Sequence, residues 1–286
     1  MSKRIEMHPV YHEIKKTLAG HYPDAEASAL TKMLLVEGLG FSTLELFGGK
    51  DKKVLKKDLD LLHEMSKRLL NDEPIQYIIG KETFCGMTFE VNDRVLIPRP
   101  ETQDLVDWIT DESHGKRSLR ILDMGTGSGC IAISLAKRLP QAQVEAWDIS
   151  EGALETAERN ALRNEVKVSF HKKDILSASV EGEQWDIMVS NPPYIAEREK
   201  ADMEANVLDW EPSNALFVPD DDPLLFYRSI ARLGINGLTE GGKLYFEINR
   251  AYGKETVEML QSLGYQDVIL RKDRYGNDRM IKATRP

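Results

Sequence analysis

The segment Ser190-Asn191-Pro192-Pro193-Tyr194 follows an apolar run and carries residue types that could do chemistry. Two adjacent prolines lack backbone donors and fix two φ angles, so neither a strand nor a helix continues through them. Asn and Pro are common turn residues, and a strand end followed by a turn is one interpretation. The other interpretation is a rigid site that holds a flat substrate.

These residue types suit methylation of a planar nitrogen conjugated to a carbonyl group or a ring, whose delocalised lone pair makes it a poor nucleophile. The side-chain oxygen of Asn191 and the carbonyl oxygen of Pro192 can each accept a hydrogen bond from an NH₂ group. Those bonds would orient the lone pair and stabilise the positive charge that develops on nitrogen. Tyr194 could stack on the flat group, while Pro193 helps to keep the segment rigid. We therefore predict that Asn191, Pro192 and Tyr194 are catalytic and that Asn191 to Tyr194 contact the substrate.

A glycine-rich turn predicts the place of a cofactor. The sequence Gly-Thr-Gly-Ser-Gly at 125–129 joins a strand-like run to an amphipathic helix, and glycines there let the backbone approach a ligand closely. An acidic residue ends the second predicted strand and another lies just past the third, where they could bind ribose hydroxyls and an adenine amino group respectively. The spacing differs from the dinucleotide fingerprint, which favours another nucleoside-bearing cofactor over NAD. The predicted cofactor residues are Gly125, Thr126, Gly127, Ser128, Gly129, Asp148, Asp174 and Asn191.

The elements around these residues alternate between strand and helix from residue 119 onward. Strands are expected near 119–124, 143–148, 166–171, 185–190, 243–248 and 265–270. This alternation is typical of a parallel sheet covered by helices, whose ligands bind at the carboxyl ends of the strands. Gly125, Asp148, Asp174 and Asn191 each fall at the carboxyl end of a predicted strand, so we expect them to lie close together.

The remainder of the chain divides into two further parts. Residues 1–80 show helical spacing of apolar residues, with helices expected at 8–19, 25–36 and 54–70, and form a predicted small helical domain. Residues 81–98 predict a β-hairpin linker with its turn at Asn92-Asp93. Residues 99–286 form the predicted α/β domain.

Composition limits the classes of function. The 286 residues are 41% hydrophobic and 30% charged, with a formal charge of −9, as in a soluble globular protein. The acidic excess falls after residue 75, which argues against a long nucleic-acid backbone as main partner. Apolar runs are too short for a membrane span, the first residues lack a signal-peptide core, and neither the two cysteines nor the histidines have convincing metal-ligand spacing. We expect a cytoplasmic protein without a metal.

Several motifs together resemble one family. The matching stretches are EPIQYIIG (73–80), VLIPRPET (95–102), ILDMGTGSG (121–129), WDIS (147–150), DIMVSNPPYI (186–195), EPSNALF (211–217) and YRSI (227–230). In this order they are similar to the S-adenosylmethionine-dependent protein-glutamine methyltransferases that modify peptide chain release factors. The resemblance implies a Rossmann-like, seven-stranded methyltransferase domain, preceded by a helical N-terminal domain for substrate recognition and a hairpin linker. It also implies S-adenosyl-L-methionine as cofactor and, as substrate, the glutamine of the Gly-Gly-Gln loop of release factors.

Carried onto this sequence, the resemblance assigns residues 125–129 and Asp148 to the cofactor, and Asn191 to Tyr194 to the glutamine amide. The segment Arg99 to Thr102 would close over the cofactor. Two positions depart from the pattern. The chain has Glu247-Ile248-Asn249 where many members have Glu-Ile-Gly, and Ile175 stands where some relatives have an aromatic residue.

Three other functions fit part of the sequence. An adenine-amino methyltransferase of DNA or RNA could use the same Asn-Pro-Pro-Tyr segment, but it needs a basic groove for the flanking strand. A glutamine of another translation protein would require the same chemistry. A binding protein that kept the cofactor pocket and lost catalysis is the third, and the intact motifs argue against it.

Overall fold

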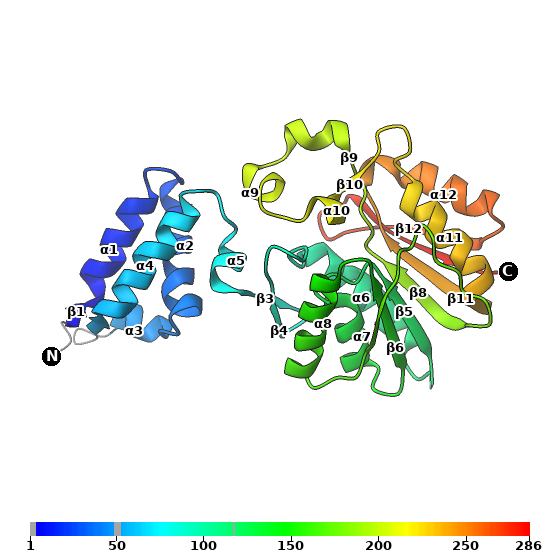
Figure 1. The fold of residues 1–286 in the computed structure, drawn as a ribbon, viewed down its shortest axis with the longest axis horizontal. Coiled ribbons are helices and arrows are strands. Elements are labelled where there is room, and N and C mark those ends of the chain that lie inside the picture. The colour runs from blue at the N-terminus through cyan, green and yellow to red at the C-terminus, as the bar shows by residue number, and fades with distance from the viewer. Residues whose placement is uncertain (1–3, 49–52, 117) are drawn as a thin grey trace. The chain divides into compact units, whose positions relative to one another are not determined.

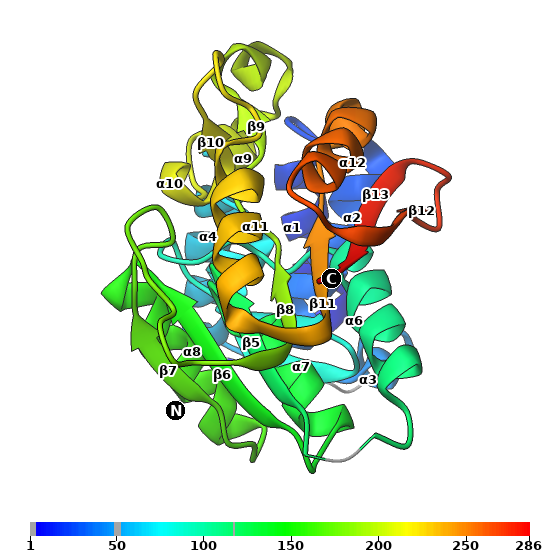
Figure 2. The same ribbon diagram turned by 90° about the vertical axis from the view of Figure 1, so that its right-hand side faces the viewer.

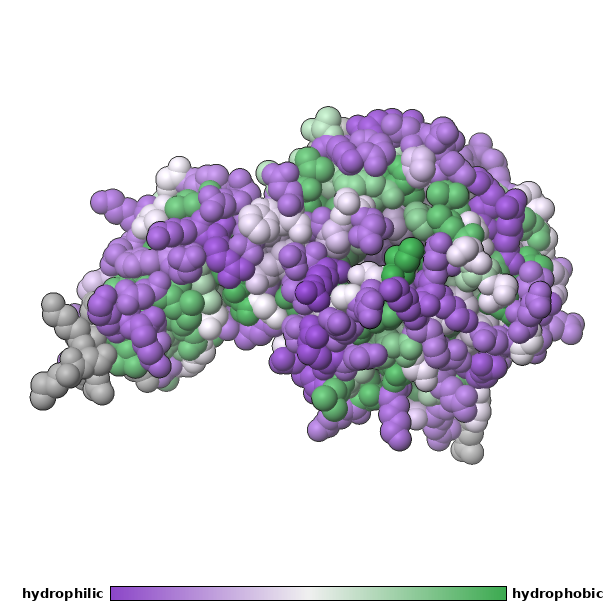
Figure 3. All heavy atoms as spheres, in the orientation of Figure 1, coloured by the Kyte–Doolittle hydropathy of each residue, from purple (hydrophilic) through white to green (hydrophobic). Residues whose placement is uncertain are grey.

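The computed structural model describes residues 4–48, 53–116 and 118–286 (Figure 1). The chain forms two compact units. The first comprises the residues up to Gly80 together with Glu204–Trp210, and the second comprises Lys81–Met203 with Glu211–Pro286. Within the described ranges no helix is both long and apolar enough to cross a membrane. On the face drawn in Figure 3, hydrophilic side chains dominate and hydrophobic ones form separate patches.

The first unit is built mainly from amphipathic helices. In α1, Val10, Ile14 and Leu18 recur every fourth residue and are fully buried in the unit's core. The predicted helices are present, although the second ends in a π-helical turn, η1. The bounds are β1 (Arg4–Glu6), α1 (Met7–Leu18), α2 (Asp24–Met33), η1 (Leu34–Gly38), α3 (Thr43–Gly48), β2 (Lys53–Leu55), α4 (Lys56–Leu69), α5 (Ile75–Ile79) and α9 (Ala205–Leu208). The short antiparallel pair β1–β2 was not expected from the sequence.

The second unit begins with a β-hairpin of β3 (Lys81–Phe84) and β4 (Met87–Glu90). Its turn is Cys85-Gly86, and the predicted turn at Asn92-Asp93 is wrong. Both turn residues have positive φ, 50° and 74°, which matches the twist of a two-residue hairpin. Asn92 instead accepts a hydrogen bond from the backbone of Arg94 after the hairpin has ended.

Among the described residues, seven strands form the central sheet in the order β12-β13-β11-β8-β5-β6-β7. Strands β7, β6, β5, β8 and β11 are parallel, whereas β13 is antiparallel to both β11 and β12 (Figure 2). The bounds are β5 (Arg120–Met124), β6 (Gln143–Asp148), β7 (Ser169–Lys172), β8 (Trp185–Ser190), β11 (Leu238–Glu247), β12 (Gln266–Lys272) and β13 (Asp278–Thr284). The predicted Rossmann-like class is confirmed.

Helices cover both faces of the sheet, with α6, α7 and α8 on one face and α11 and α12 on the other (Figure 1). Neighbouring residues of a strand point to opposite faces, so Ile121 packs into one core and Leu122 into the other. The bounds are α6 (Pro100–Ser113), α7 (Cys130–Arg138), α8 (Glu151–Arg163), α11 (Leu225–Gly237) and α12 (Gly253–Ser262). Between β8 and α11 lie β9 (Ile195–Ala196), η2 (Glu197–Asp202), α10 (Ser213–Leu216) and β10 (Phe217–Val218), and η3 (Arg250–Tyr252) precedes α12.

Candidate active site

The glycine loop lies between the last residue of β5 and the first residue of α7. Gly125, Gly127 and Gly129 have φ angles of 74°, 54° and 81°, a region that residues with a side chain rarely adopt. A side chain at Gly129 would also place its Cβ 2.8 Å from Ile133 and 3.1 Å from Ala157. The loop therefore needs glycine both for its backbone path and for close packing of α7.

The buried side chain of Asn160 in α8 forms a hydrogen bond to the backbone of this loop, a role that the sequence did not predict. Its side-chain nitrogen donates to the carbonyl oxygens of Ser128, at 2.9 Å, and of Glu90, at 3.0 Å. Its side-chain oxygen accepts from the backbone N–H of Glu90 at 2.6 Å. One amide thus connects α8, the glycine loop and the end of the hairpin.

A cavity of about 300 Å³ opens beside the glycine loop, at the carboxyl ends of β5, β6 and β8. Its volume is at the lower end of the range for small-molecule sites. The predicted residues that line it are Gly125, Thr126, Gly127, Ser128, Asp148, Asp174, Asn191 and Pro193. Gly129, Pro192 and Tyr194 are not among the described residues of the lining.

Asp148, the last residue of β6, shapes both the cavity and the loop. One carboxylate oxygen accepts from the backbone N–H of Gly127 and the other from that of Ser150, each at 2.9 Å. Burial raises the pKa of this carboxyl, and the backbone donors oppose that shift. Asp174 accepts from the backbone of Leu176 at 2.9 Å and from the hydroxyl of Ser177 at 3.1 Å.

The Asn-Pro-Pro-Tyr segment leaves β8 at Ser190, and its two polar side chains reach different neighbours. The side-chain nitrogen of Asn191 lies 3.4 Å from the hydroxyl of Thr102. The hydroxyl of Tyr194 donates to the carboxylate of Glu247 at 3.2 Å. Pro192 is buried, and Tyr194 is half-buried against the core on the α11 face.

Glu247, the last residue of β11, is 1% exposed. It accepts a 2.6 Å hydrogen bond from Thr102 besides the bond from Tyr194. Burial raises its pKa, and this is opposed by the bond from Thr102 and by the charge of Arg279. Within the segment Arg99 to Thr102, both end residues line the cavity in which the cofactor is expected. Thr102 also contacts the side chain of Asn191.

Asn249, one of the two departures from the family pattern, binds the backbone of the Asn-Pro-Pro-Tyr segment through its side chain. Its side-chain nitrogen donates to the carbonyl oxygen of Tyr194 at 3.1 Å and to Glu199 at 3.2 Å. Its side-chain oxygen accepts from the backbone of Ala251 and caps η3. Ile175, the second departure, lines the cavity.

Further lining residues come from parts of the chain to which sequence reasoning gave no site role. They are Arg94, Val95, Leu96 and Pro98 before α6, Cys130, Ile131, Ile149, Ser150, Ala153, Lys173 and Leu176 near the glycine loop and β6, and Asn214, Ala215 and Phe226. Asn214 and Ala215 belong to the EPSNALF stretch, which carries part of the family resemblance but no predicted site residue. Glu211 at the start of that stretch is buried and forms an ion pair with Arg99. The stretch is therefore attached to the rim of the cavity.

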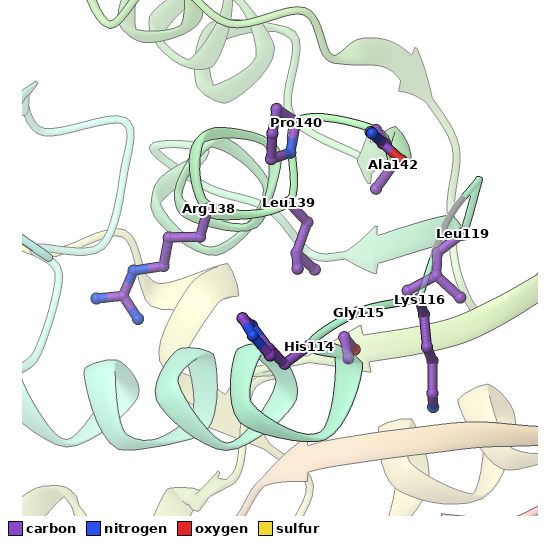
Figure 4. Close-up of a pocket in the computed structure, with 10 residues that line it drawn as sticks. His114, Gly115, Lys116, Leu119, Arg138, Leu139, Pro140 and Ala142 are labelled. Carbon is purple, nitrogen blue, oxygen red and sulfur yellow. The ribbon is translucent and has the colours of Figure 1, made fainter.

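A second cavity, of about 310 Å³, contains none of the predicted site residues (Figure 4). It lies between the segment that follows α6, His114 to Lys116, and the connection from α7 to β6. These segments precede β5 and β6, so the cavity is at the amino ends of the strands, the edge opposite the glycine loop. Arg138 in its wall points away from Pro140 and pairs with Asp107. This cavity lacks the arrangement found at the carboxyl edge.

Comparisons with known proteins find relatives over most of the chain. Residues 10–80 match the family model described as PrmC N-terminal domain, and residues 101–209 match the methyltransferase small domain. A release factor glutamine methyltransferase from Bacteroides thetaiotaomicron is 50% identical, over 95% of this chain and 98% of that protein. Proteins of the same name from Flavobacterium psychrophilum and Chlorobaculum tepidum are 46% and 37% identical, covering 94% and 95% of this chain and 95% and 96% of their own lengths.

Solved structures share the fold. A methyltransferase from Pyrococcus furiosus is 19% identical, with a TM-score of 0.51 over 77% of this chain and 98% of that one. The Thermus thermophilus 16S rRNA N2 G1207 methyltransferase, solved with AdoMet and guanosine, is 18% identical, with a TM-score of 0.53 over 72% of this chain and 50% of that one. At this level of identity the likeness extends to the fold alone.

Proposed function

Because the chain belongs to the release factor glutamine methyltransferase family, we propose that it methylates the side-chain amide nitrogen of the glutamine in the Gly-Gly-Gln loop of a peptide chain release factor. It is an S-adenosylmethionine-dependent protein-glutamine N-methyltransferase, a class in which the methyl donor and the acceptor amide must share one site. The observation that carries the proposal is that Asn191 lines the same cavity as the glycine loop and Asp148.

The cavity suits S-adenosyl-L-methionine, the cofactor of this enzyme class. Its volume of about 300 Å³ is bordered by a loop that only glycines can form and by two carboxylates at the ends of neighbouring strands. We propose that Gly125 to Ser128 and Asp148 hold the cofactor, while Gly129 serves the packing of the loop; Asp148 would accept from ribose hydroxyls and Asp174 from the adenine amino group. When bound, the cofactor supplies a methyl group that is activated by a positively charged sulfur.

The acceptor amide needs orientation more than it needs a base. We propose that the side-chain oxygen of Asn191 and the carbonyl oxygen of Pro192 accept the two N–H groups of the glutamine amide. These acceptors would turn the nitrogen lone pair toward the donor and stabilise the positive charge that develops there. Pro193 limits the motion of the segment, and the ring of Tyr194 supports the flat amide. The proton can leave after methyl transfer, so the mechanism requires no strong general base.

We propose that the helical domain, residues 1–80, binds the release factor. It has its own hydrophobic core, and residues 10–80 match the model described as PrmC N-terminal domain. The proposed substrate acts on the ribosome, so the proposed place of action is the cytoplasm.

Radiolabelled S-adenosyl-L-methionine tests the proposal. The purified protein is incubated with a release factor, with the same factor carrying Gln→Ala in the Gly-Gly-Gln loop, and with unmethylated DNA. We expect label on the wild-type factor and none on the alanine control. Label on DNA would instead indicate an adenine-amino methyltransferase, and equal label on both factors would place the methyl group on another residue.

A further inference from the structure

One buried carboxylate lies behind both polar side chains of the Asn-Pro-Pro-Tyr segment. Glu247 Oε2 accepts from Thr102 at 2.6 Å, and Glu247 Oε1 accepts from Tyr194 at 3.2 Å. Asn191 approaches the same threonine oxygen at 3.4 Å through its side-chain nitrogen. Two of the residues proposed to act on the substrate are therefore linked to Glu247, one directly and one through Thr102.

The direction of these hydrogen bonds follows from the number of protons on each group. The hydrogen bonds from Thr102 and Tyr194 and the charge of Arg279 favour the ionised form of Glu247. An ionised carboxylate only accepts, so the single hydroxyl proton of Thr102 is directed at Glu247. The lone pairs of the threonine oxygen are then left for Asn191, whose NH₂ end is the one that can donate. The amide of Asn191 is thereby fixed in one of its two orientations, with its oxygen turned away from Thr102.

We propose that Glu247, acting through Thr102, sets the orientation of the Asn191 amide so that its oxygen accepts from the substrate. This inference rests on the proposed function and adds two positioning residues to it. In the opposite orientation Asn191 would present an NH₂ group to the NH₂ group of the glutamine. Two donors would then face each other, and the acceptor that orients the lone pair would be lost.

We call this chain of contacts, from Glu247 through Thr102 to Asn191, the relay. Thr102→Val tests it, because valine keeps the shape of threonine and removes its hydroxyl. We expect kcat at saturating cofactor to fall about 10- to 100-fold, since the loss is one of orientation, and the Kd of the cofactor is measured separately because Thr102 also lines the cavity. Thr102→Ser keeps the hydroxyl and should restore kcat to within about threefold of the wild type. The matched control is Thr110→Val in the same helix, whose hydroxyl donates only to the backbone of Val106.

Glu247→Gln provides an independent variant, because its amide can donate as well as accept and no longer dictates the direction of the Thr102 bond. It should lower kcat like Thr102→Val. Its control is Glu112→Gln, since Glu112 also accepts from a tyrosine, Tyr245, at 2.8 Å, besides Trp108 and Lys282, and does not line the cavity. Thermal melts of all variants separate loss of folding from loss of orientation.

The side-chain amide signals of Asn191 in an NMR spectrum report the relay without any substrate. We expect them to shift and broaden in Thr102→Val and to be unchanged in Thr110→Val. Unchanged signals in Thr102→Val, or full kcat in both Thr102→Val and Glu247→Gln, would overturn the relay. A wild-type protein that fails to methylate the release factor would overturn the proposed function instead, and the NMR result would still decide the relay.

Discussion

Thr102 and Glu247 lie 145 residues apart in the sequence, yet the threonine hydroxyl donates a 2.6 Å hydrogen bond to the buried glutamate. Thr102 is in the first turn of α6, and Glu247 ends β11. The bond therefore joins the start of a helix to the carboxyl edge of the sheet, beside the strand that carries Asn191. The site depends on three distant segments that meet at one buried carboxylate.

Asn191→Ala removes the proposed acceptor. We expect kcat for release-factor methylation to fall by at least about 10²-fold, as for other preorganised groups that stabilise developing charge. Cofactor binding should weaken only modestly, because the glycine loop and Asp148 are unchanged. Calorimetric titration of the cofactor and single-turnover kinetics separate the two effects. Full turnover in this variant would contradict the mechanism.

Tyr194→Phe keeps the ring and removes the hydroxyl that donates to Glu247. The variant leaves a buried carboxylate with one donor fewer, so we expect the free energy of unfolding to fall by about 1 kcal/mol and kcat to fall severalfold. Tyr245→Phe is the matched control, because its hydroxyl also donates to a carboxylate, that of Glu112. Equal losses of kcat in both variants would indicate a general effect of stability.

Asp148→Ala should weaken the binding of the cofactor. The carboxylate shapes the loop through Gly127 and is the proposed partner of ribose hydroxyls, so we expect the Kd for S-adenosyl-L-methionine to rise about 10- to 100-fold. At saturating cofactor, kcat should change much less. Glu151→Ala, three residues further along and exposed, is the control. An unchanged Kd for Asp148→Ala would remove this residue from the cofactor site.

Asn249→Gly restores the Glu-Ile-Gly pattern of the family at the position where this chain has asparagine. The variant loses hydrogen bonds to Tyr194 and Glu199 and the cap of η3. We expect the free energy of unfolding to fall by about 1–2 kcal/mol and kcat to fall less than in Thr102→Val. Denaturant unfolding and steady-state kinetics measure both. A variant as stable as the wild type would show that these bonds are replaced by water.

Asp123 on β5 gives stability a dependence on pH. It is fully buried, accepts from Thr126 at 2.6 Å and from the backbone of Ala132 at 3.2 Å, and burial raises its pKa to about 7. In the unfolded chain an aspartate loses its proton near pH 4, so the native state holds more protons between about pH 4 and 7, and stability falls as pH rises through that range.

Asp123→Asn lacks this titration and should keep both accepted bonds. The difference in unfolding free energy between the variant and the wild type should therefore move in favour of the variant from pH 4 to pH 7 and level off above it. The change is a few kcal/mol at most, since one pKa unit corresponds to about 1.4 kcal/mol. Urea unfolding at a series of pH values measures it, and a difference that is constant with pH would contradict the raised pKa.

The parallel strands at the centre of the sheet could be predicted from the sequence, because they are short apolar runs that end at the predicted functional residues. The bounds were less accurate at the edges. The third strand is β7 at 169–172 where 166–171 was predicted, although Val166 and Val168 still pack against the core. The sequence predicts six strands by residue range, and β13 is not among them because charged residues such as Arg279 and Lys282 interrupt its apolar pattern.

Residues of the site were predictable where one motif carried them and not where distant segments meet. Gly125, Asp148 and Asn191 each lie at the carboxyl end of a strand, and parallel strands bring such ends to one edge. The bonds that Glu247 makes to Thr102 and Tyr194 join positions without any fixed spacing in sequence. Asn160 gave no signal either, because its partners are backbone atoms of the loop and the hairpin.

The most direct test of the central claim is to locate the transferred methyl group. A release factor is incubated with the protein and S-adenosyl-L-methionine that carries a deuterated methyl group, and the peptide containing the Gly-Gly-Gln loop is fragmented in a mass spectrometer. We predict that the added mass lies on the side chain of the glutamine and is absent with Asn191→Ala. Added mass on any other residue, or an unmodified peptide with the wild-type protein, would contradict the account.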